Sequence, residues 1–168
     1  MLNIYKFSVL LLLGLMVLVS YYIVFVKLYK STKSYIEHEF WFGIDTTIVK
    51  MLVFFQVLAI VGFIMSVSSL IRNVPTTGIL SKYLFSVLCL FFVSAIVWPY
   101  ATYYKQPIIV VASLVCTAIA SILLLAGSIE SDQPKWYIVL GLILLSIVTV
   151  LGDGVVWNAN YIYKQLYP

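Results

Sequence analysis

Five long runs of uncharged, mostly apolar residues limit what this chain can fold into. The fifth, Trp136–Gly152, is interrupted by Asp153 and then resumes as far as Trp157. The other four are each 20 residues or longer: Phe7–Val26, Met51–Ile71, Tyr83–Tyr104 and Gln106–Ile129. A hydrocarbon core of about 30 Å needs roughly 20 helical residues at about 1.5 Å each. Each run therefore predicts one membrane-spanning helix, and the fifth reaches this length only if it passes through Asp153.

The composition requires lipid as the solvent for much of the chain. Hydrophobic residues make up 64% of the sequence and charged residues 10%, whereas soluble domains have roughly 45–50% and about 25%. The runs are too long for the strands of a membrane barrel and lack their alternation, and helices satisfy their own backbone groups inside lipid. We therefore expect an all-α integral membrane protein, a bundle of five transmembrane helices with short loops.

The charged positions set the boundaries of the spans. We expect a single membrane domain over residues 1–168, with spans at about 7–27, 50–71, 82–104, 107–129 and 136–157. The longest loop, residues 28–49, contains Glu37-His38-Glu39 and then Phe40-Trp41-Phe42, whose rings we expect at the level of the lipid headgroups. No small-x-small cleavage site follows the first run, so we expect it to be retained as a span rather than removed as a signal peptide.

Lysine and arginine are divided unequally between the two sides of the membrane. Five spans place the first loop, the third loop and the C-terminus on one side, which holds Lys27, Lys30, Lys33, Lys50, Lys105 and Lys164. The other side holds Lys6, Arg72, Lys82 and Lys135. Because cytoplasmic loops carry the excess of basic residues, the C-terminus and the first loop are expected in the cytoplasm, and the basic loops are expected to contact the lipid bilayer.

The sequence lacks the side-chain sets that are typical of catalysis. His38 is the only histidine, so no Ser–His–Asp or Cys–His pair and no zinc site is expected. Cys89 and Cys116 each lie inside a span at no metal spacing, and we interpret them as packing residues. The net charge of +4 is spread over the loops. We therefore expect no enzymatic activity, no catalytic residues, no metal, no resident cofactor and no nucleic-acid partner.

Asp153 is the only acidic residue inside a predicted span. A carboxylate at the centre of a bilayer costs roughly 2.5–3.5 kcal/mol on insertion scales. On an α-helix Asp153, Trp157 and Asn160 fall at i, i+4 and i+7, on one face. Two interpretations are open: this face contacts a ligand or an ion inside the bundle, or the helix ends there and Asp153 reaches interfacial water.

Other polar or helix-bending residues in the spans can also be interpreted either as part of a functional site or as structural features of the helices. Proline in Trp98-Pro99-Tyr100 removes a backbone hydrogen bond near the end of the third span. The resulting bend either opens a cavity between helices or marks a kinked helix end at the interface. Ser113, Thr117 and Ser121 recur every four residues, which favours close helix packing over a pore lining. Gln56 is expected to hydrogen-bond a neighbouring helix.

Three features, in this order, resemble the TspO/MBR family, the tryptophan-rich sensory proteins that include the mitochondrial translocator protein. Trp41 lies in the first loop, and Trp98-Pro99 lies late in the third span. The ending Val156-Trp157-Asn158-Ala159-Asn160 is similar to that family's Val-Trp-x-x-Asn, and Asp153 falls where the family usually has asparagine. The chain departs from the family in two places: Thr46–Leu58 contains no Pro or Trp, and the fourth span has no acidic residue.

The resemblance implies a small dimeric five-helix bundle whose cavity binds porphyrins, sterols or related flat hydrophobic molecules. Trp98, Asp153, Trp157 and Asn160 are the site residues that it carries over, and Pro99 joins them through the expected bend. Aromatic walls with few polar groups suit such ligands. Two alternatives remain: a structural or assembly subunit of a larger membrane complex, and an oligomeric channel or transporter built around Asp153.

Overall fold

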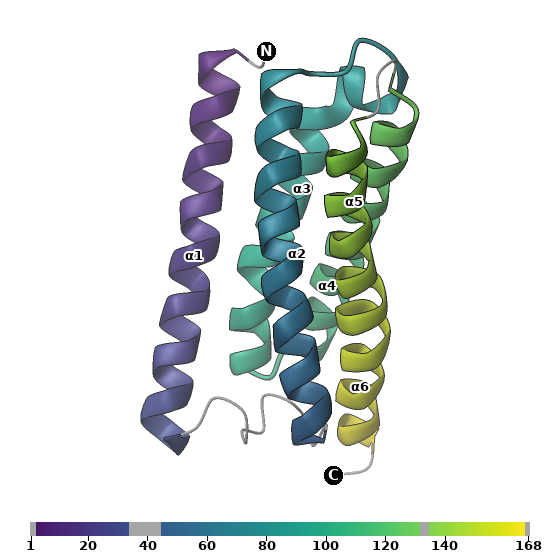
Figure 1. The fold of residues 1–168 in the computed structure, drawn as a ribbon. Helices are drawn as coiled ribbons and strands as arrows, with labels where there is room; N and C mark the ends of the chain where they lie inside the picture. The colour runs from purple at the N-terminus through teal and green to yellow at the C-terminus, as the bar shows by residue number, and fades with distance from the viewer. Residues whose placement is uncertain (1–2, 34–44, 132–134, 167–168) are drawn as a thin grey trace.

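The computed structural model of the protein is an all-α bundle (Figure 1), which confirms the predicted fold class. It describes residues 3–33, 45–131 and 135–166, so Glu37-His38-Glu39 and Phe40-Trp41-Phe42 lie outside the described residues. Five helices are long and apolar enough to cross a membrane. Their bounds are α1 Ile4–Thr32, α2 Thr46–Arg72, α3 Gly78–Tyr103, α4 Pro107–Ile129, and a last continuous span made of α5 Trp136–Ser146, the π-helix η2 Ile147–Trp157 and α6 Asn158–Leu166.

Local capping fixes where several helices begin. The Asn3 side chain accepts a 2.9 Å hydrogen bond from the Lys6 backbone N–H at the start of α1. Asp45 caps α2 by accepting a 2.8 Å bond from the Thr47 backbone N–H, and this bond lowers the pKa of the Asp45 carboxyl below its usual range. Pro107 is the first residue of α4, where its missing N–H costs nothing. The spans therefore begin just inside polar residues that stay at the membrane surface.

The helices do not pack in chain order. α1 packs against α3, α3 against α4, α4 against both α5 and η2, and α2 against α5. The two termini lie at opposite ends of the bundle (Figure 1), as an odd number of spans requires. The outward faces of the helices carry exposed apolar side chains, among them Leu11, Leu15, Leu18, Phe54, Ile64, Val115 and Leu151. An apolar outer face of this kind requires lipid rather than water around the bundle.

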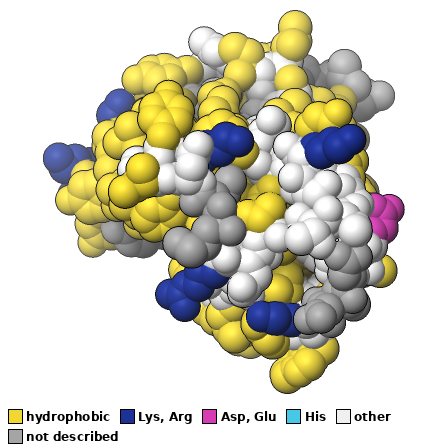
Figure 2. All heavy atoms as spheres, turned by 90° about the horizontal axis from the view of Figure 1, so that it is seen from above, with side chains coloured by type: hydrophobic (Ala, Val, Ile, Leu, Met, Phe, Trp, Pro, Cys, Tyr) yellow, Lys and Arg dark blue, Asp and Glu magenta, His cyan; other side chains and the backbone are white. Residues whose placement is uncertain are grey.

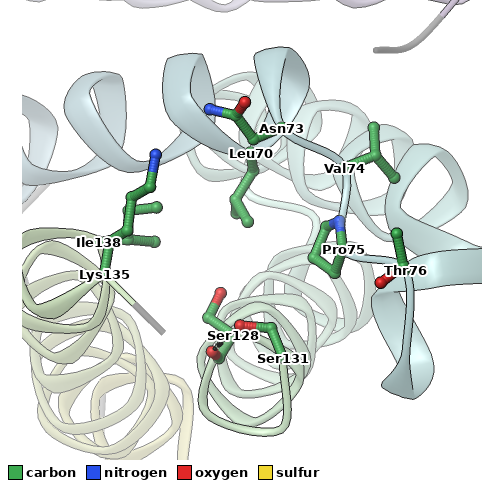
Figure 3. A pocket seen from close by; sticks show the side chains of 9 residues that line it. All are labelled: Leu70, Asn73, Val74, Pro75, Thr76, Ser128, Ser131, Lys135 and Ile138. Atoms are coloured by element: carbon green, nitrogen blue, oxygen red, sulfur yellow. Dashed lines mark hydrogen bonds between the residues drawn. The ribbon is translucent and has the colours of Figure 1, made fainter. Parts of the chain in front are cut away.

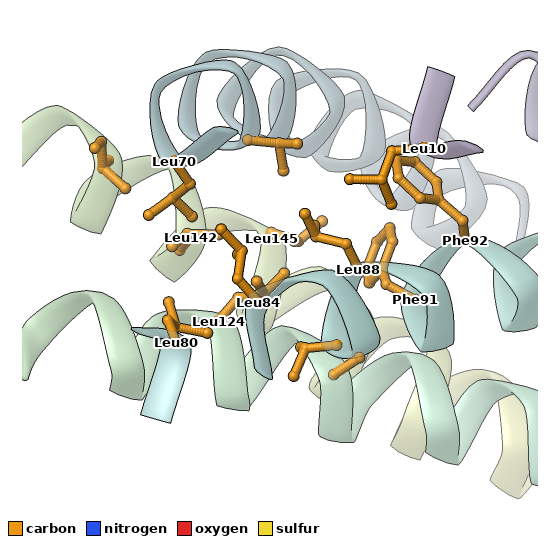
Figure 4. Packing of buried hydrophobic residues seen from close by; sticks show 14 of the residues in the cluster. Leu10, Leu70, Leu80, Leu84, Leu88, Phe91, Phe92, Leu124, Leu142 and Leu145 are labelled. Carbon is orange, nitrogen blue, oxygen red and sulfur yellow. The ribbon is translucent and has the colours of Figure 1, made fainter. Parts of the chain in front are cut away.

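The interior divides into two halves along the membrane normal. The half nearer the N-terminus is an aliphatic core with two phenylalanines whose rings meet edge to face (Figure 4), formed by Leu80, Leu84, Leu88, Phe91, Phe92, Leu124, Leu142 and Leu145. The half nearer the C-terminus is built around two tryptophans and contains Val24, Leu28, Val49, Trp98, Ala101, Val110, Leu114 and Trp157. The aromatic and polar candidates from the sequence therefore fall in the second half.

Glycines bring α2 and α5 into backbone contact. A Cβ atom added at Gly62 would lie 2.9 Å from the Cα of Gly141, and one added at Gly141 would lie 2.6 Å from the carbonyl oxygen of Gly62. Ser66 donates a 3.0 Å hydrogen bond across the same contact to the backbone oxygen of Ile138. Small residues at a helix interface allow this close approach in lipid.

We predict that Gly141→Ala destabilises the bundle, because its methyl group must push α2 and α5 apart. Overpacking of this kind costs about 1–3 kcal/mol, and each kcal/mol lowers the melting temperature of a domain this size by about 2–4 °C. Thermal melts in a mild detergent measure the change. Gly14→Ala is the control, because its Cβ would lie at an ordinary 3.8 Å from the Phe92 ring. Equal melting temperatures for the two variants would contradict the prediction.

Candidate functional site

The fifth span passes through Asp153 as a π-helix. η2 covers Ile147–Trp157, and the backbone N–H of Asn158 donates to the carbonyl of Asp153, five residues earlier. The chain then continues as α6 to Leu166, so the helix does not end near Trp157. π-Helical turns are rare in proteins, but those that occur are often found at functional sites. Gly152 and Gly154 flank Asp153. The last span departs from regular α-helical geometry in this segment.

This wider helical turn changes which side chains share a face. Trp157 and Asn158 are buried, at 2% and 5% exposure, while Asp153 is partly exposed. Asn160 is also partly exposed, and its amide donates a 2.8 Å hydrogen bond to Val156 of its own helix. The i, i+4, i+7 relation expected for Asp153, Trp157 and Asn160 assumed a regular α-helix, which is not the local geometry here.

The structure brings Trp98 and Trp157 together with Tyr21 of α1. The two indole rings meet edge to face with their centroids 5.8 Å apart. The Tyr21 ring lies 5.7 Å from the Trp98 ring, and Trp98 Nε1 donates a 2.9 Å hydrogen bond to the Tyr21 hydroxyl. Pro99 is fully buried beside Trp98, and α3 continues through it to Tyr103. α1, α3 and η2 thus meet at one aromatic cluster.

A polar group borders this aromatic cluster. The Gln56 side chain of α2 lies close to the Asp153 carboxylate of η2, and the expected hydrogen bond of Gln56 to a neighbouring helix stays a prediction. Tyr21 is close enough to Asp153 for the carboxylate charge to act on its hydroxyl. Tyr21 therefore belongs both to the aromatic cluster and to the surroundings of the carboxylate. We call Tyr21, Gln56, Trp98, Asp153 and Trp157 the junction, since they join α1, α2, α3 and η2.

Polar side chains also link α4 to its neighbours. Thr117 donates a 2.8 Å hydrogen bond to Ser94 of α3, and Ser121 shares a 2.7 Å bond with Thr149 of η2. Ser113 is buried in the same row and bonds to the backbone oxygen of Val110. The serine and threonine row of α4 therefore lies in the helix interfaces, as the packing interpretation predicted.

Two residues of this region were not among the sequence candidates. Tyr21 lies in a long apolar run. Its hydroxyl was the sequence feature that could have indicated a contact with another helix, because a phenol in a span needs a polar partner. Asn158 is buried, and its Nδ2 donates a 3.2 Å bond to the Gly154 backbone oxygen. The Asn158 Oδ1 is buried and has no hydrogen-bond partner among the described residues. Gly152 and Gly154, on either side of Asp153, were the sequence feature that could have indicated an irregular helix.

The described residues contain no group of three or more His, Cys, Asp or Glu side chains that could hold a metal ion. Cys89 and Cys116 are free thiols within the spans. The chemistry that the junction offers is therefore one carboxylate, one amide, one phenol and two indoles in a largely apolar surround. Such a set can bind and orient a molecule, and it contains no nucleophile paired with a base.

Comparison of the chain with protein-family models, curated proteins and solved structures finds no match. The class of protein rests on the fold itself. Five apolar helices with an apolar outer face define a polytopic α-helical membrane protein.

We predict that Tyr21→Phe changes the environment of Trp98, because it removes the hydroxyl that accepts the indole N–H. The loss should lower the stability by roughly 0.6–1.7 kcal/mol, the range of hydrogen bonds between membrane helices, and shift the Trp98 emission maximum. Fluorescence of a protein that keeps Trp98 as its only tryptophan measures the shift. Tyr22→Phe is the matched control, since Tyr22 is 71% exposed. An identical spectrum and melting temperature in both variants would refute the assigned contact.

Proposed function

We propose that the protein binds a flat hydrophobic molecule of porphyrin or sterol type at the junction, within the membrane. The observation that carries the proposal is the edge-to-face meeting of Trp98 and Trp157 in the half of the bundle nearer the C-terminus, with Asp153 four residues before Trp157 in the same helix. Aromatic faces supply contact area for a flat apolar ligand, and a few polar groups fix its orientation. The resemblance to the TspO/MBR family points to the same class of ligand.

The arrangement of α1 and α2 supports access from the lipid. α1 packs on α3, whereas α2 packs on α5 and η2, so these consecutive helices share little contact with each other. Tyr21 of α1 and Gln56 of α2 are the junction residues on these two helices, and both lie in the neighbourhood of Asp153. A small sideways movement of α1 would expose the indoles without breaking the packing of α3, α4 and α5.

Asp153 gives the proposed site its polarity. Intramembrane acidic residues are expensive and are usually tied to function, and Asp153 is the only one in the spans. Its carboxylate would accept a hydrogen bond from a ligand hydroxyl or ring N–H. We therefore expect ligands with one donor on an otherwise apolar ring system to bind better than hydrocarbons of the same size.

The contacts of the junction support the two alternative functions, a subunit of a larger complex and an oligomeric channel or transporter, less well. A subunit of a larger complex is expected to present its small and polar rows to other proteins, yet Ser113, Thr117 and Ser121 are buried within this chain. An oligomeric channel around Asp153 needs that carboxylate on a subunit interface, whereas it lies close to Gln56 of the same chain. Purification in mild detergent as a monomer or homodimer is the outcome expected from the ligand-binding proposal.

We predict saturable quenching of tryptophan fluorescence when a porphyrin is titrated into the protein in lipid nanodiscs. Trp98→Leu and Trp157→Leu should each weaken the apparent affinity by about tenfold, because the loss of an aromatic contact of up to about 1.5 kcal/mol corresponds to about tenfold in Kd. Trp136→Leu is the control: Trp136 is 75% exposed and lies at the far end of the bundle. Its substitution should leave the affinity unchanged.

Asp153→Asn provides an independent test of the polar contact. Asparagine keeps the size of the side chain and removes its charge, so a donor-bearing ligand should bind more weakly while an apolar analogue without the donor is unaffected. Glu130→Gln removes an exposed carboxylate outside the junction and serves as the control. Quenching that is linear in porphyrin concentration, or equal in all variants, would exclude the junction as the binding site.

A further inference from the structure

Two adjoining hollows lie at the end of the bundle opposite the junction, where α2 ends and α5 begins. Their volumes are about 270 and 310 Å³. Asn73 and Lys135 line both hollows, and Arg72 lines the second. Figure 2 views this end of the molecule and shows basic side chains spread over it. The hollows differ from the junction in being polar and open to the membrane surface.

The charged side chains that line the hollows among the described residues are basic. Arg72 and Lys135 come from different helices and border the same space. No aspartate or glutamate among the described residues lines either hollow. Two cations held on one concave wall attract an anion, and the Arg72 guanidinium offers the forked donor geometry that matches a phosphate or a carboxylate.

Ser128 supplies a second and independent sign of a ligand. It is 3% exposed and lines the first hollow with its side chain turned toward it (Figure 3). Its Oγ is buried and has no hydrogen-bond partner among the described residues. The nearby Ser131 hydroxyl donates to the backbone oxygen of Ser128 instead. A buried hydroxyl costs free energy unless it is satisfied, and an acceptor oxygen in the hollow would satisfy it.

The hollows also lie at the ends of membrane-spanning helices, the level at which lipid phosphates are expected. They sit where three spans end, and Trp136, next to Lys135, is 75% exposed at the same level. Exposed tryptophans concentrate at the boundary between hydrocarbon and headgroups. Met65 forms part of the second hollow on its membrane side. A molecule bound here could therefore place a phosphate on the basic wall and an apolar chain along α2.

We propose that these hollows form a binding site for a phosphate-bearing anion. Arg72 and Lys135 contact the phosphate oxygens, and Ser128 and Asn73 donate hydrogen bonds to the remaining oxygens. The same chemistry is presented by the headgroup of an anionic phospholipid and by free phosphate. This site is separate from the junction and does not depend on the function proposed for it.

The test is native mass spectrometry of the protein in a neutral detergent with three probes. These are dihexanoyl phosphatidylglycerol, the matching dihexanoyl glycerol without phosphate, and inorganic phosphate. We expect saturable binding of a phosphate-bearing probe, weakened at least tenfold in Arg72→Gln/Lys135→Gln. Lys6→Gln/Lys82→Gln is the matched control, because it removes two charges from the same end of the bundle at residues that line neither hollow.

Ser128→Ala separates binding from folding. Its hydroxyl has no protein partner among the described residues, so this variant should keep the wild-type melting temperature and still bind the probe more weakly. Binding of phosphatidylglycerol alone supports the proposal with a lipid as the occupant, and equally sensitive binding of inorganic phosphate supports it with a soluble anion. Equal affinity of both double variants, or equal binding of the phosphate-free glycerol, would overturn it.

Discussion

Lipid offers no hydrogen bonds, and this constraint organises the interior of the bundle. Each polar side chain that enters a span must find its partner in its own helix or in the next one. Side-chain hydrogen bonds of this kind link each helix to at least one neighbour. Tyr21 and Trp98 join α1 to α3, Ser94 and Thr117 join α3 to α4, Ser121 and Thr149 join α4 to η2, and Ser66 joins α2 to the backbone oxygen of Ile138 in α5.

These bonds do more for specificity than for stability. Hydrogen bonds between membrane helices average about 0.6 kcal/mol, so four of them are a modest contribution. Apolar helices, however, slide and rotate against one another at little cost, because lipid contacts replace protein contacts of the same kind. A hydrogen bond fixes both the rotation and the height of each helix. The junction is thereby held at one level in the bundle.

Much of this fold follows from the sequence alone, because the number of spans depends only on charge spacing and bilayer thickness. The packing role of Thr117 and Ser121 was also predictable, since a repeat of four places side chains on one face. The partnership of Tyr21 with Trp98 was not, because the two residues are 77 positions apart and nothing local links them. The π-helix was equally hidden, since Gly152 and Gly154 permit an irregular turn without specifying its register.

The glycine contact between Gly62 and Gly141 has a consequence for how the bundle is made. The main packing partner of α2 is α5, which belongs to the last span. After the end of α2, about 65 further residues must be synthesised before α5 begins and can pack against it. Until then the small-residue face of α2 is covered by lipid alone. The order of synthesis therefore makes α5 the closing element, and a chain truncated before it would have four inserted helices and an incomplete bundle.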